Sequence, residues 1–467
     1  MTLTPLLSLE EWGEAQLRIS AMRMAECVSA TGLVKHRAAF GQTVRPALGS
    51  VVAATGSSAS EDEPDYFFHW LRDSAAVMRA GLALIRCGID ADGWRQRFAD
   101  FVRFSLDLGR IDGTRFLTET PDLSERTAPE ARQYLRGGDE IGVVKGERVL
   151  GEVRYNADGT LDFLRWNRPQ HDGPAARAAV CMRYLEAGAV PDEARADTEA
   201  LLRLDLDYTM NHAGEPCYDI WEEEFGWHFY TLLLQLDSLR YGADWAVRWK
   251  DLPLSWSYDD ARHRIENRLE DFDALKLGIF PSQLTPDGKA ALKQLDFSVI
   301  LGFLHRIHDY GRRTVWDTRT EKTMNALGEI FAGDYAINNA AGKAQGLAFG
   351  RYAGDSYVSG GAWFICTFGA AEFHYRHAVA RLRPKGIVLS SERIAFSKAQ
   401  IAKGDAIMQM ARRFIPASGD ISEQFDRTTG AQTSAKNLAW SHSAFITAWR
   451  ARKDALLEFS GALGDSQ

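Results

Sequence analysis

Two acidic segments that lie far apart in the chain carry the residue types best suited to chemistry. One reads Tyr-Asp-Ile-Trp-Glu-Glu-Glu at 218–224, and the other reads Gly-Asp-Ile-Ser-Glu-Gln-Phe-Asp at 419–426. Inverting hydrolysis of a glycosidic bond needs two carboxyl groups, one to protonate the leaving oxygen and one to activate water. Each segment offers a carboxyl group beside an aromatic ring and polar neighbours, which is the composition of a sugar subsite. The alternative interpretation is that both segments are solvated acidic patches.

Three further segments concentrate aromatic, charged and glycine residues between predicted helices. They read Pro-Asp-Tyr-Phe-Phe-His-Trp-Leu-Arg-Asp-Ser at 64–74, Trp-Asn-Arg-Pro-Gln-His-Asp-Gly-Pro at 166–174 and Gly-Arg-Tyr-Ala-Gly-Asp-Ser-Tyr at 350–357. Sugar faces pack on aromatic rings, while the N–H or O–H of the same side chain still finds a polar partner. Because these three segments accompany the two acidic ones, we favour one carbohydrate-binding site over two unrelated acidic patches.

The elements that must position these loops are mostly helices, because helical periodicity recurs about a dozen times. Apolar residues fall at i, i+3, i+4 and i+7 spacing, and Ala194, Leu201, Leu204 and Tyr208 share one such face. The clearest predicted helices cover residues 73–87, 94–108, 174–187, 192–212, 227–241, 297–308, 362–382, 391–414 and 437–457.

Strand-like stretches are few and short. They are residues 49–54 and a hairpin around the Asn-Ala-Asp-Gly sequence at 156–159. The chain has no βαβ alternation, which argues against a parallel sheet. Long loops follow alternate helices, so we predict an all-α toroid of helix hairpins with its functional loops gathered at one end. No linker-like stretch divides the chain, and one compact domain is the simplest interpretation.

Composition and charge narrow the range of partners. The chain has 55 basic and 63 acidic residues and a net charge of −8, which argues against nucleic acid as a partner. Mean hydropathy is −0.27. No apolar run reaches the roughly 18 residues that a membrane span needs, so we expect no membrane partner. The sequence does not indicate an oligomeric state.

The cysteines and histidines do not predict a metal site. The five cysteines are scattered, odd in number and never spaced as Cys-x-x-Cys, so neither a zinc site nor a disulfide framework is expected. His305 and His308 lack a nearby third ligand, and we predict no metal and no other cofactor. Reduced thiols and the lack of a signal-like N-terminus favour the cytoplasm. A periplasmic or secreted protein is the alternative if a signal has been removed.

The five segments together resemble the glucoamylases of glycoside hydrolase family 15. The resemblance runs in order from about Trp12 to Trp449, and the phrases Trp-x-Arg-Pro-Gln-x-Asp-Gly-Pro, Tyr-Asp-Ile-Trp-Glu-Glu and Ser-Glu-Gln-Phe-Asp are highly specific in combination. It implies an (α/α)6 barrel and exo-hydrolysis of α-glucosidic bonds in an oligosaccharide, with release of β-glucose by inversion. It also implies a single catalytic domain over residues 1–467, with no starch-binding module.

Carried over by position, the resemblance makes Glu222 the general acid and Glu423 the general base. Glu223 would bind the sugar in subsite +1, on the leaving-group side, with a solvated glutamate as the alternative. Arg72 and Asp73 would grip the hydroxyls of the terminal glucose in subsite −1, unless they form only a structural ion pair.

Further residues of the same motifs are expected around the pocket. Arg351 would contact the sugar in subsite −1 with Tyr357 close by, or would form an ordinary loop ion pair. Arg168 and Asp172 would support the acid. The aromatic lining would come from five side chains, namely Tyr66, Trp70, Trp166, Trp221 and Trp440. The alternative is that these side chains pack only in the hydrophobic core.

Several positions depart from the family pattern. Asn167 replaces a glycine, Gly361-Ala362 stands where Asn-Pro is usual, and Trp227 and His228 replace smaller residues. We expect these positions to border subsite +1 and the two bulky residues to narrow it. An α-1,4 linkage is the main prediction. The alternatives are an enzyme that prefers α-1,6 linkages or trehalose, and a non-catalytic glycan-binding toroid.

Overall fold

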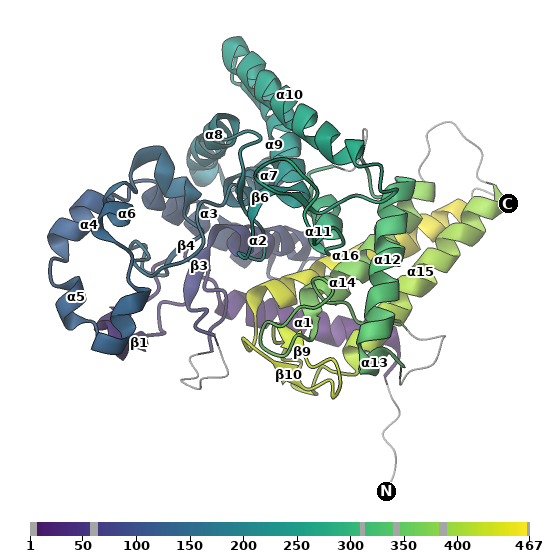
Figure 1. Ribbon diagram of the computed structural model, residues 1–467. Helices are drawn as coiled ribbons and strands as arrows, with labels where there is room; N and C mark the ends of the chain where they lie inside the picture. The colour runs from purple at the N-terminus through teal and green to yellow at the C-terminus, as the bar shows by residue number, and fades with distance from the viewer. Residues whose placement is uncertain (1–6, 57–63, 309–312, 340–345, 383–389, 465–467) are drawn as a thin grey trace, which may run out of the picture.

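The computed structural model describes residues 7–56, 64–308, 313–339, 346–382 and 390–464. Within them, six helices form a closed inner ring, because each contacts its two neighbours and the last returns to the first (Figure 1). In ring order they are α2 (Leu71–Arg86), α7 (Asp172–Glu186), α9 (Phe229–Arg248), α11 (Ser298–His305), α14 (Phe364–Leu382) and α16 (Ala439–Gly464).

Six outer helices surround this ring. Five of them pack against the inner helix that precedes them in sequence, and the first helix of the chain packs against the last inner helix, α16. The outer helices are α1 (Leu9–Glu26), α3 (Ala91–Leu108), α8 (Arg195–Asn211), α10 (Leu252–Ala274), α12 (Thr318–Asp334) and α15 (Ser391–Arg412). Inner and outer helices alternate along the chain, which is the (α/α)6 barrel that the sequence predicted. The predicted helices are confirmed, with ends displaced by up to seven residues, at the ends of α9 and α16.

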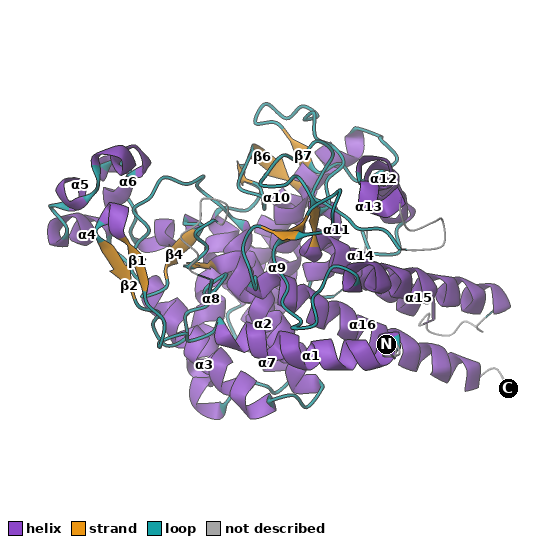
Figure 2. Cartoon of the chain, turned by 90° about the horizontal axis from the view of Figure 1, so that it is seen from below, coloured by secondary structure: helices purple, strands orange, loops and turns teal. Residues whose placement is uncertain are grey.

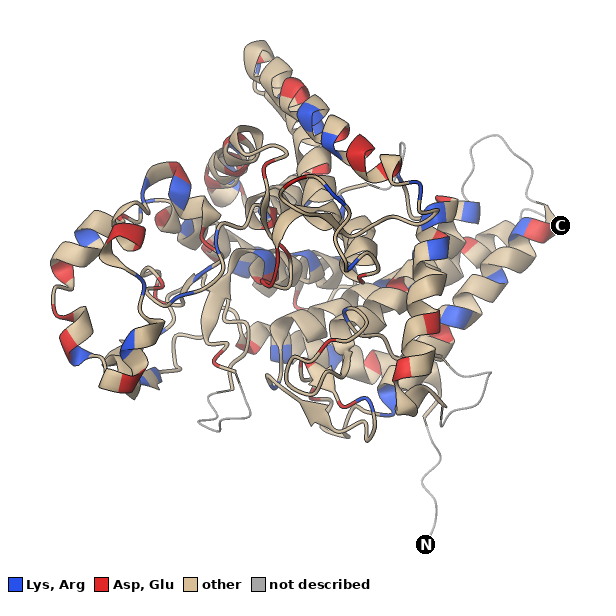
Figure 3. Ribbon diagram, in the orientation of Figure 1, with Lys and Arg blue, Asp and Glu red and all other residues tan. Residues whose placement is uncertain are grey.

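The inner and outer helices differ in how they bury their side chains. Helix α14 is buried around most of its circumference, because it packs against both its ring neighbours and the outer helix α15. The outer helices α10 and α15 expose faces of mixed positive and negative charge (Figure 3). A side-chain cap from Asp251 and an early proline, Pro253, start α10 despite its polar composition.

Short antiparallel strands brace the loops at one end of the ring (Figure 2). Three of them lead directly into inner helices: β3 into α2, β6 into α9 and β8 into α14. The strand pairs are β1 (Lys35–Arg37) with β2 (Gln42–Val44), β3 (Phe68–Trp70) with β4 (Arg154–Asn156), β5 (Cys217–Tyr218) with β6 (Phe225–His228), β6 with β7 (Gln283–Leu284), and β9 (Gln424–Phe425) with both β8 (Ala362–Trp363) and β10 (Gln432–Thr433).

The two strand-like stretches of the sequence have different outcomes. The predicted hairpin at 156–159 is present as a tight turn, with Gly159 at φ +87° and a bridge between Tyr155 and Leu161. Residues 49–54 form only isolated bridges, from Val51 to Val28 and from Ala54 to Leu438.

A lobe formed by residues 109–165 lies beside the barrel (left in Figure 1). A second, smaller hydrophobic core, which includes Leu123, Ile141 and Phe163, packs the lobe against Leu71 of α2 and Phe104 of α3. Its short helices are α4 (Gly113–Glu119), α5 (Leu123–Arg126), η2 (Pro129–Tyr134), α6 (Gly138–Gly142) and η3 (Gly146–Gly151). The other short helices are η1 (Ala38–Phe40), η4 (Asp192–Ala194) and α13 (Ala336–Asn339).

In the described residues, no helix is both long and apolar enough to cross a membrane.

Candidate active site

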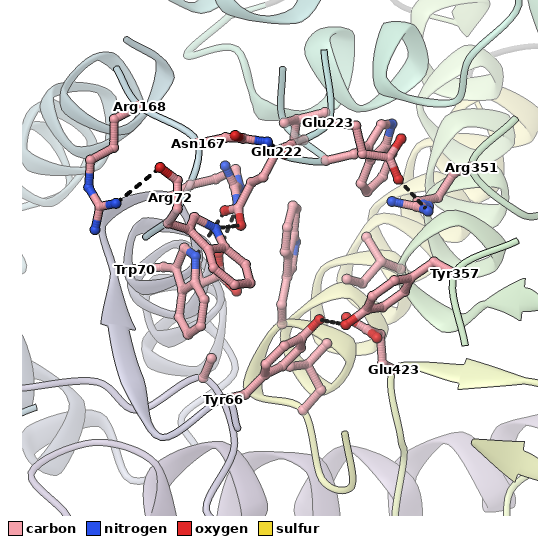
Figure 4. Close-up of a pocket in the computed structure, with 18 of the residues that line it drawn as sticks. Tyr66, Trp70, Arg72, Asn167, Arg168, Glu222, Glu223, Arg351, Tyr357 and Glu423 are labelled. Carbon is pink, nitrogen blue, oxygen red and sulfur yellow. Dashed lines mark hydrogen bonds and ion pairs between the residues drawn. The ribbon is translucent and has the colours of Figure 1, made fainter. Parts of the chain in front are cut away.

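A cavity of about 1000 Å³ opens where the inner helices begin, and it contains nearly every residue that the motifs predicted (Figure 4). Asp172 is the exception, because it lies behind Arg72 and does not line the cavity. The predicted residues that do line it are Tyr66, Trp70, Arg72, Asp73, Trp166, Arg168, Trp221, Glu222, Glu223, Arg351, Tyr357, Glu423 and Trp440. Five distant segments thus converge on one site.

Glu222 stands on the tight turn that joins β5 to β6. Its backbone has φ +67°, a left-handed conformation that non-glycine residues rarely adopt, and such strain is concentrated at functional sites. One carboxylate oxygen accepts hydrogen bonds from Trp70 Nε1 and Arg72 Nη2, both at 2.9 Å. The other oxygen accepts one from Trp166 Nε1. These three donors fix the direction in which the carboxyl group faces the cavity.

Arg72 is surrounded by three carboxyl groups, which are those of Glu222 at 2.9 Å, Asp172 at 3.3 Å and Asp73 at 3.6 Å. One guanidinium cannot balance three negative charges in a buried site. Burial, together with the charges of Glu222 and Asp172, raises the pKa of Asp73 to about 7. The group therefore retains a proton at mildly acidic pH, close to the predicted acid.

Glu423 faces Glu222 across the cavity (Figure 4). It follows α15 on the loop that enters β9, and its residue exposure is only 3%. Ser434 Oγ donates to its carboxylate at 2.5 Å, and the Tyr66 and Tyr357 hydroxyls meet at 2.8 Å beside it. Burial raises the pKa of Glu423 to about 7, against the opposing hydrogen bonds of Ser434 and Tyr66.

Arg351 connects two acidic residues at the edge of the site. Its guanidinium makes a bidentate pair with Asp355, at 2.7 and 2.6 Å, and lies 2.8 Å from Glu223 Oε1. The second oxygen of Glu223 accepts a 2.5 Å hydrogen bond from the Tyr352 hydroxyl. Glu223 is thereby turned away from its neighbour Glu222, as the predicted separation of their roles requires.

Polar and charged partners hold the aromatic residues, at the ring edge of Trp221 and over the rings of Trp440 and Trp166. Trp221 Nε1 donates to Asp296 at 2.9 Å, and Trp440 lies 5.5 Å from the Arg72 guanidinium. Trp166 is 41% exposed at the cavity mouth, where the Arg154 guanidinium stacks on its ring at 3.8 Å. A sugar ring entering the cavity therefore meets oriented aromatic faces.

The two residues expected to support the acid act at different distances from it. Asp172 contacts Arg72, which contacts Glu222, so its support runs through one intermediate residue. Arg168 pairs instead with Glu152 at 2.5 Å and Asp162 at 3.0 Å. It reaches the acid only through the Trp166 carbonyl, to which it donates at 3.1 Å.

The departures from the family pattern divide into Asn167, which lines the cavity, and Gly361-Ala362, Trp227 and His228, which do not. Asn167 Nδ2 donates a 2.6 Å hydrogen bond to the carbonyl oxygen of Glu222. Trp227 and His228 do not line the cavity, because Trp227 Nε1 binds the Gly214 carbonyl at 2.8 Å and His228 Nε2 contacts the Cys217 carbonyl at 3.0 Å. The expectation that these two residues narrow the site is wrong.

Replacing Asn167 by glycine is expected to lower kcat/KM on maltose about threefold to tenfold, the value of one hydrogen bond that orients a reacting group. Asn167→Asp has nearly the same size but lacks the N–H donor and places a negative charge beside a carbonyl, so it should be the more damaging change. Steady-state kinetics of both variants check this. Equal activity of all three proteins would show that the Asn167 contact does not position Glu222.

The sequence motifs did not include several residues of the site. The lobe supplies the outer wall of the cavity through Arg136, Glu140, Val143 and Arg165. Arg136 is oriented by Glu152, with contacts of 2.9 and 3.0 Å. Ser434 also lay outside the motifs, and no local pattern marks any of these residues as part of a site.

One group of metal-ligating residue types occurs among the described residues, formed by His171, His212 and Glu215. It lies outside the cavity lining. Both ring nitrogens of His212 are already engaged, with Glu147 at 2.8 Å and Glu215 at 2.7 Å.

Comparison with known proteins agrees with this architecture. The chain is 27% identical to Glucoamylase 1 of Rhizopus oryzae, over 87% of this chain and 68% of that protein. It is 29% identical to a probable glucoamylase of Schizosaccharomyces pombe, over 94% and 91% of the two chains. A solved glucoamylase from Saccharomycopsis fibuligera superposes with a TM-score of 0.76 at 23% identity, over 96% of each chain, and establishes the fold alone. The model of glycosyl hydrolases family 15 matches residues 142–450, and the chain belongs to that family.

Proposed function

We propose that this protein is an exo-acting glucan 1,4-α-glucosidase that releases β-glucose from the non-reducing ends of malto-oligosaccharides or soluble starch. The observation that carries the proposal is the placement of Glu222 and Glu423 on facing walls of one cavity. The relatives described above are glucoamylases, and this supports the α-1,4 linkage over the α-1,6 and trehalose alternatives.

In the proposed mechanism, protonated Glu222 gives its proton to the glycosidic oxygen as the bond from that oxygen to C1 breaks. Glu423, as the carboxylate, removes a proton from a water molecule, and the water oxygen bonds to C1 from the opposite face. Each turnover thus moves one proton to the leaving group and one to Glu423, and the configuration at C1 inverts. A non-catalytic glycan-binding protein would need neither carboxyl group.

The remaining groups of the cavity suit the binding of a chain end. Arg72 and Asp73, at the start of α2, offer a charged donor and an acceptor to the hydroxyls of a terminal glucose in subsite −1. Glu223 stands beside the acid on the leaving-group side, where it can accept from a sugar in subsite +1. Tyr66, Trp70 and Trp440 supply ring faces for the C–H groups of the sugar.

The proposal includes one catalytic domain in a reducing compartment. Helix α16 packs against both α1 and α2, which joins the two ends of the described chain in one barrel. The five cysteines form no disulfide, and four of them are buried. These observations support a cytoplasmic protein, since paired cysteines are usual in oxidising compartments.

Rates on maltose, maltotriose, isomaltose and trehalose, combined with proton NMR detection of the first product, test the proposed function. We expect β-glucose as the first product and faster turnover of the α-1,4-linked substrates. Isomaltose or trehalose turning over much faster than maltose would contradict the linkage. Initial appearance of α-glucose would contradict inversion.

A further inference from the structure

We propose that Lys293 is a positioning residue of this active site, and that its charge holds the turn bearing Glu222 and Glu223 in its working conformation. The inference rests on the proposed function. Lys293 lies between β7 and α11, outside the cavity lining and outside every sequence motif described above.

The ammonium group of Lys293 lies at the centre of a carboxylate cluster, which we define as Asp219, Glu223, Glu224 and Asp296. Its Nζ is 3.6 Å from Asp219, Glu223 and Asp296 and 3.8 Å from Glu224. The side chain is only 12% exposed. Nζ has no hydrogen-bond partner within the described residues, so it acts on the four carboxylates through charge at nearly equal distances.

Two members of the cluster fix the acid-bearing turn directly. Asp219 Oδ1 accepts hydrogen bonds from the backbone N–H groups of Glu223, at 2.7 Å, and Glu224, at 3.0 Å. Asp296 accepts from Trp221 Nε1, at 2.9 and 3.1 Å, on the residue that precedes Glu222. The general acid is therefore held on both sides by carboxylates that share Lys293 as their counter-charge.

The third member faces the leaving-group side of the site. Arg351 contacts Oε1 of Glu223, whereas Tyr352 and Lys293 both contact its Oε2. The Tyr352 ring lies 4.0 Å from the same ammonium group, which gives the lysine a cation–π contact as well. Lys293 thus links Glu223 to the elements that hold Glu222.

Loss of this charge would leave Glu223 with Arg351, but Asp219, Glu224 and Asp296 would lie close together with no cation beside them among the described residues. Asp219 and Asp296 are buried, and like charges in a buried site repel strongly or force the uptake of protons. Either response weakens the contacts by which Asp219 and Asp296 hold the turn that bears Glu222. A displacement of about 1 Å at a catalytic group can cost on the order of 100-fold in rate.

Lys293→Met, which keeps the length of the side chain without its charge, tests the proposal. Maltose and α-glucosyl fluoride serve as paired substrates, because fluoride leaves without a proton from the acid and places no sugar in subsite +1. We expect kcat/KM on maltose to fall about 30- to 100-fold and that on the fluoride to fall less than about threefold. Lys289→Met removes an exposed lysine of the same connection and should match the wild type.

Two further variants keep the proposal testable if Lys293→Met folds poorly. Lys293→Arg retains the charge and should keep most of the activity on maltose. Lys293→Met/Asp296→Asn removes one negative charge together with the positive one and should recover part of the loss. Unchanged maltose kinetics in Lys293→Met, or equal losses on both substrates, would overturn the proposal. A wild-type protein inactive on all the α-1,4-linked substrates would instead overturn the proposed function.

Discussion

Replacing Glu423 by glutamine is expected to lower kcat on maltose by about 10³-fold, the usual contribution of a general base. Glutamine cannot remove a proton from the attacking water, but it keeps the size of the side chain and can still accept from Ser434. Oligosaccharide binding should therefore remain measurable by calorimetry. Undiminished turnover would remove Glu423 from the role of base.

The same substitution should also stabilise the folded protein above neutral pH. Burial raises the pKa of Glu423 from 4.5 to about 7, so the folded state binds the proton more tightly than the unfolded state does. In the wild type, the stabilisation of the folded state by this tighter proton binding is fully present below pH 4.5 and is lost as the pH rises to about 7. The variant does not undergo this loss of stability. Above pH 7, its free energy of unfolding should therefore exceed that of the wild type by up to about 3 kcal/mol.

Thermal unfolding at pH 4 and pH 8 separates this effect from a general change in packing. The two proteins should unfold at similar temperatures at pH 4 and differ at pH 8, where the variant is the more stable. Asp426→Asn is a matched control from the same segment. The N–H groups of Thr429 and Thr428 lower the pKa of Asp426, so its neutralisation should destabilise the protein at pH 8. A lower unfolding temperature for Glu423→Gln at pH 8 would contradict the argument.

The helical barrel could be predicted from the sequence because its strongest signals are local. Periodicity located α3 and α8 closely, since each has one buried face and one more exposed face. Helix α10 gives a weaker signal, because it is polar around much of its circumference and is fixed by its cap and by contacts with α9. The order of helices around the ring depends on contacts between distant segments, which periodicity does not encode.

The motif residues of the site were also predictable, since each motif brings its aromatic, acidic and basic groups together within a few positions. Lys293 could not be predicted in this way, because three of its four carboxylate partners, Asp219, Glu223 and Glu224, come from a distant segment of the chain. Trp227 was misplaced for a different reason. It lies in β6, where pairing with β7 sets its register and turns its indole toward Gly214 instead of the cavity.

Replacing Glu222 by glutamine is expected to lower kcat/KM on maltose by about 10³-fold and that on α-glucosyl fluoride by less than about tenfold. The difference arises because an alcohol leaving group needs the proton of Glu222, whereas fluoride departs without one. The glutamine oxygen can still accept from Trp70 and Arg72, although the bond from Trp166 to the other oxygen is lost, so most of the pocket architecture should survive. Steady-state rates on both substrates, with glucose and fluoride release measured separately, give the ratio.

Glu215→Gln is the control for this substitution, since Glu215 lies two residues before β5 and does not line the cavity. It should leave both rates unchanged. Comparable losses on maltose and on the fluoride in Glu222→Gln would mean that Glu222 shapes the pocket without donating a proton. Protonation of the leaving group would then have to come from another acid beside Arg72, and Asp73, whose pKa is raised to about 7, is the residue placed to supply it.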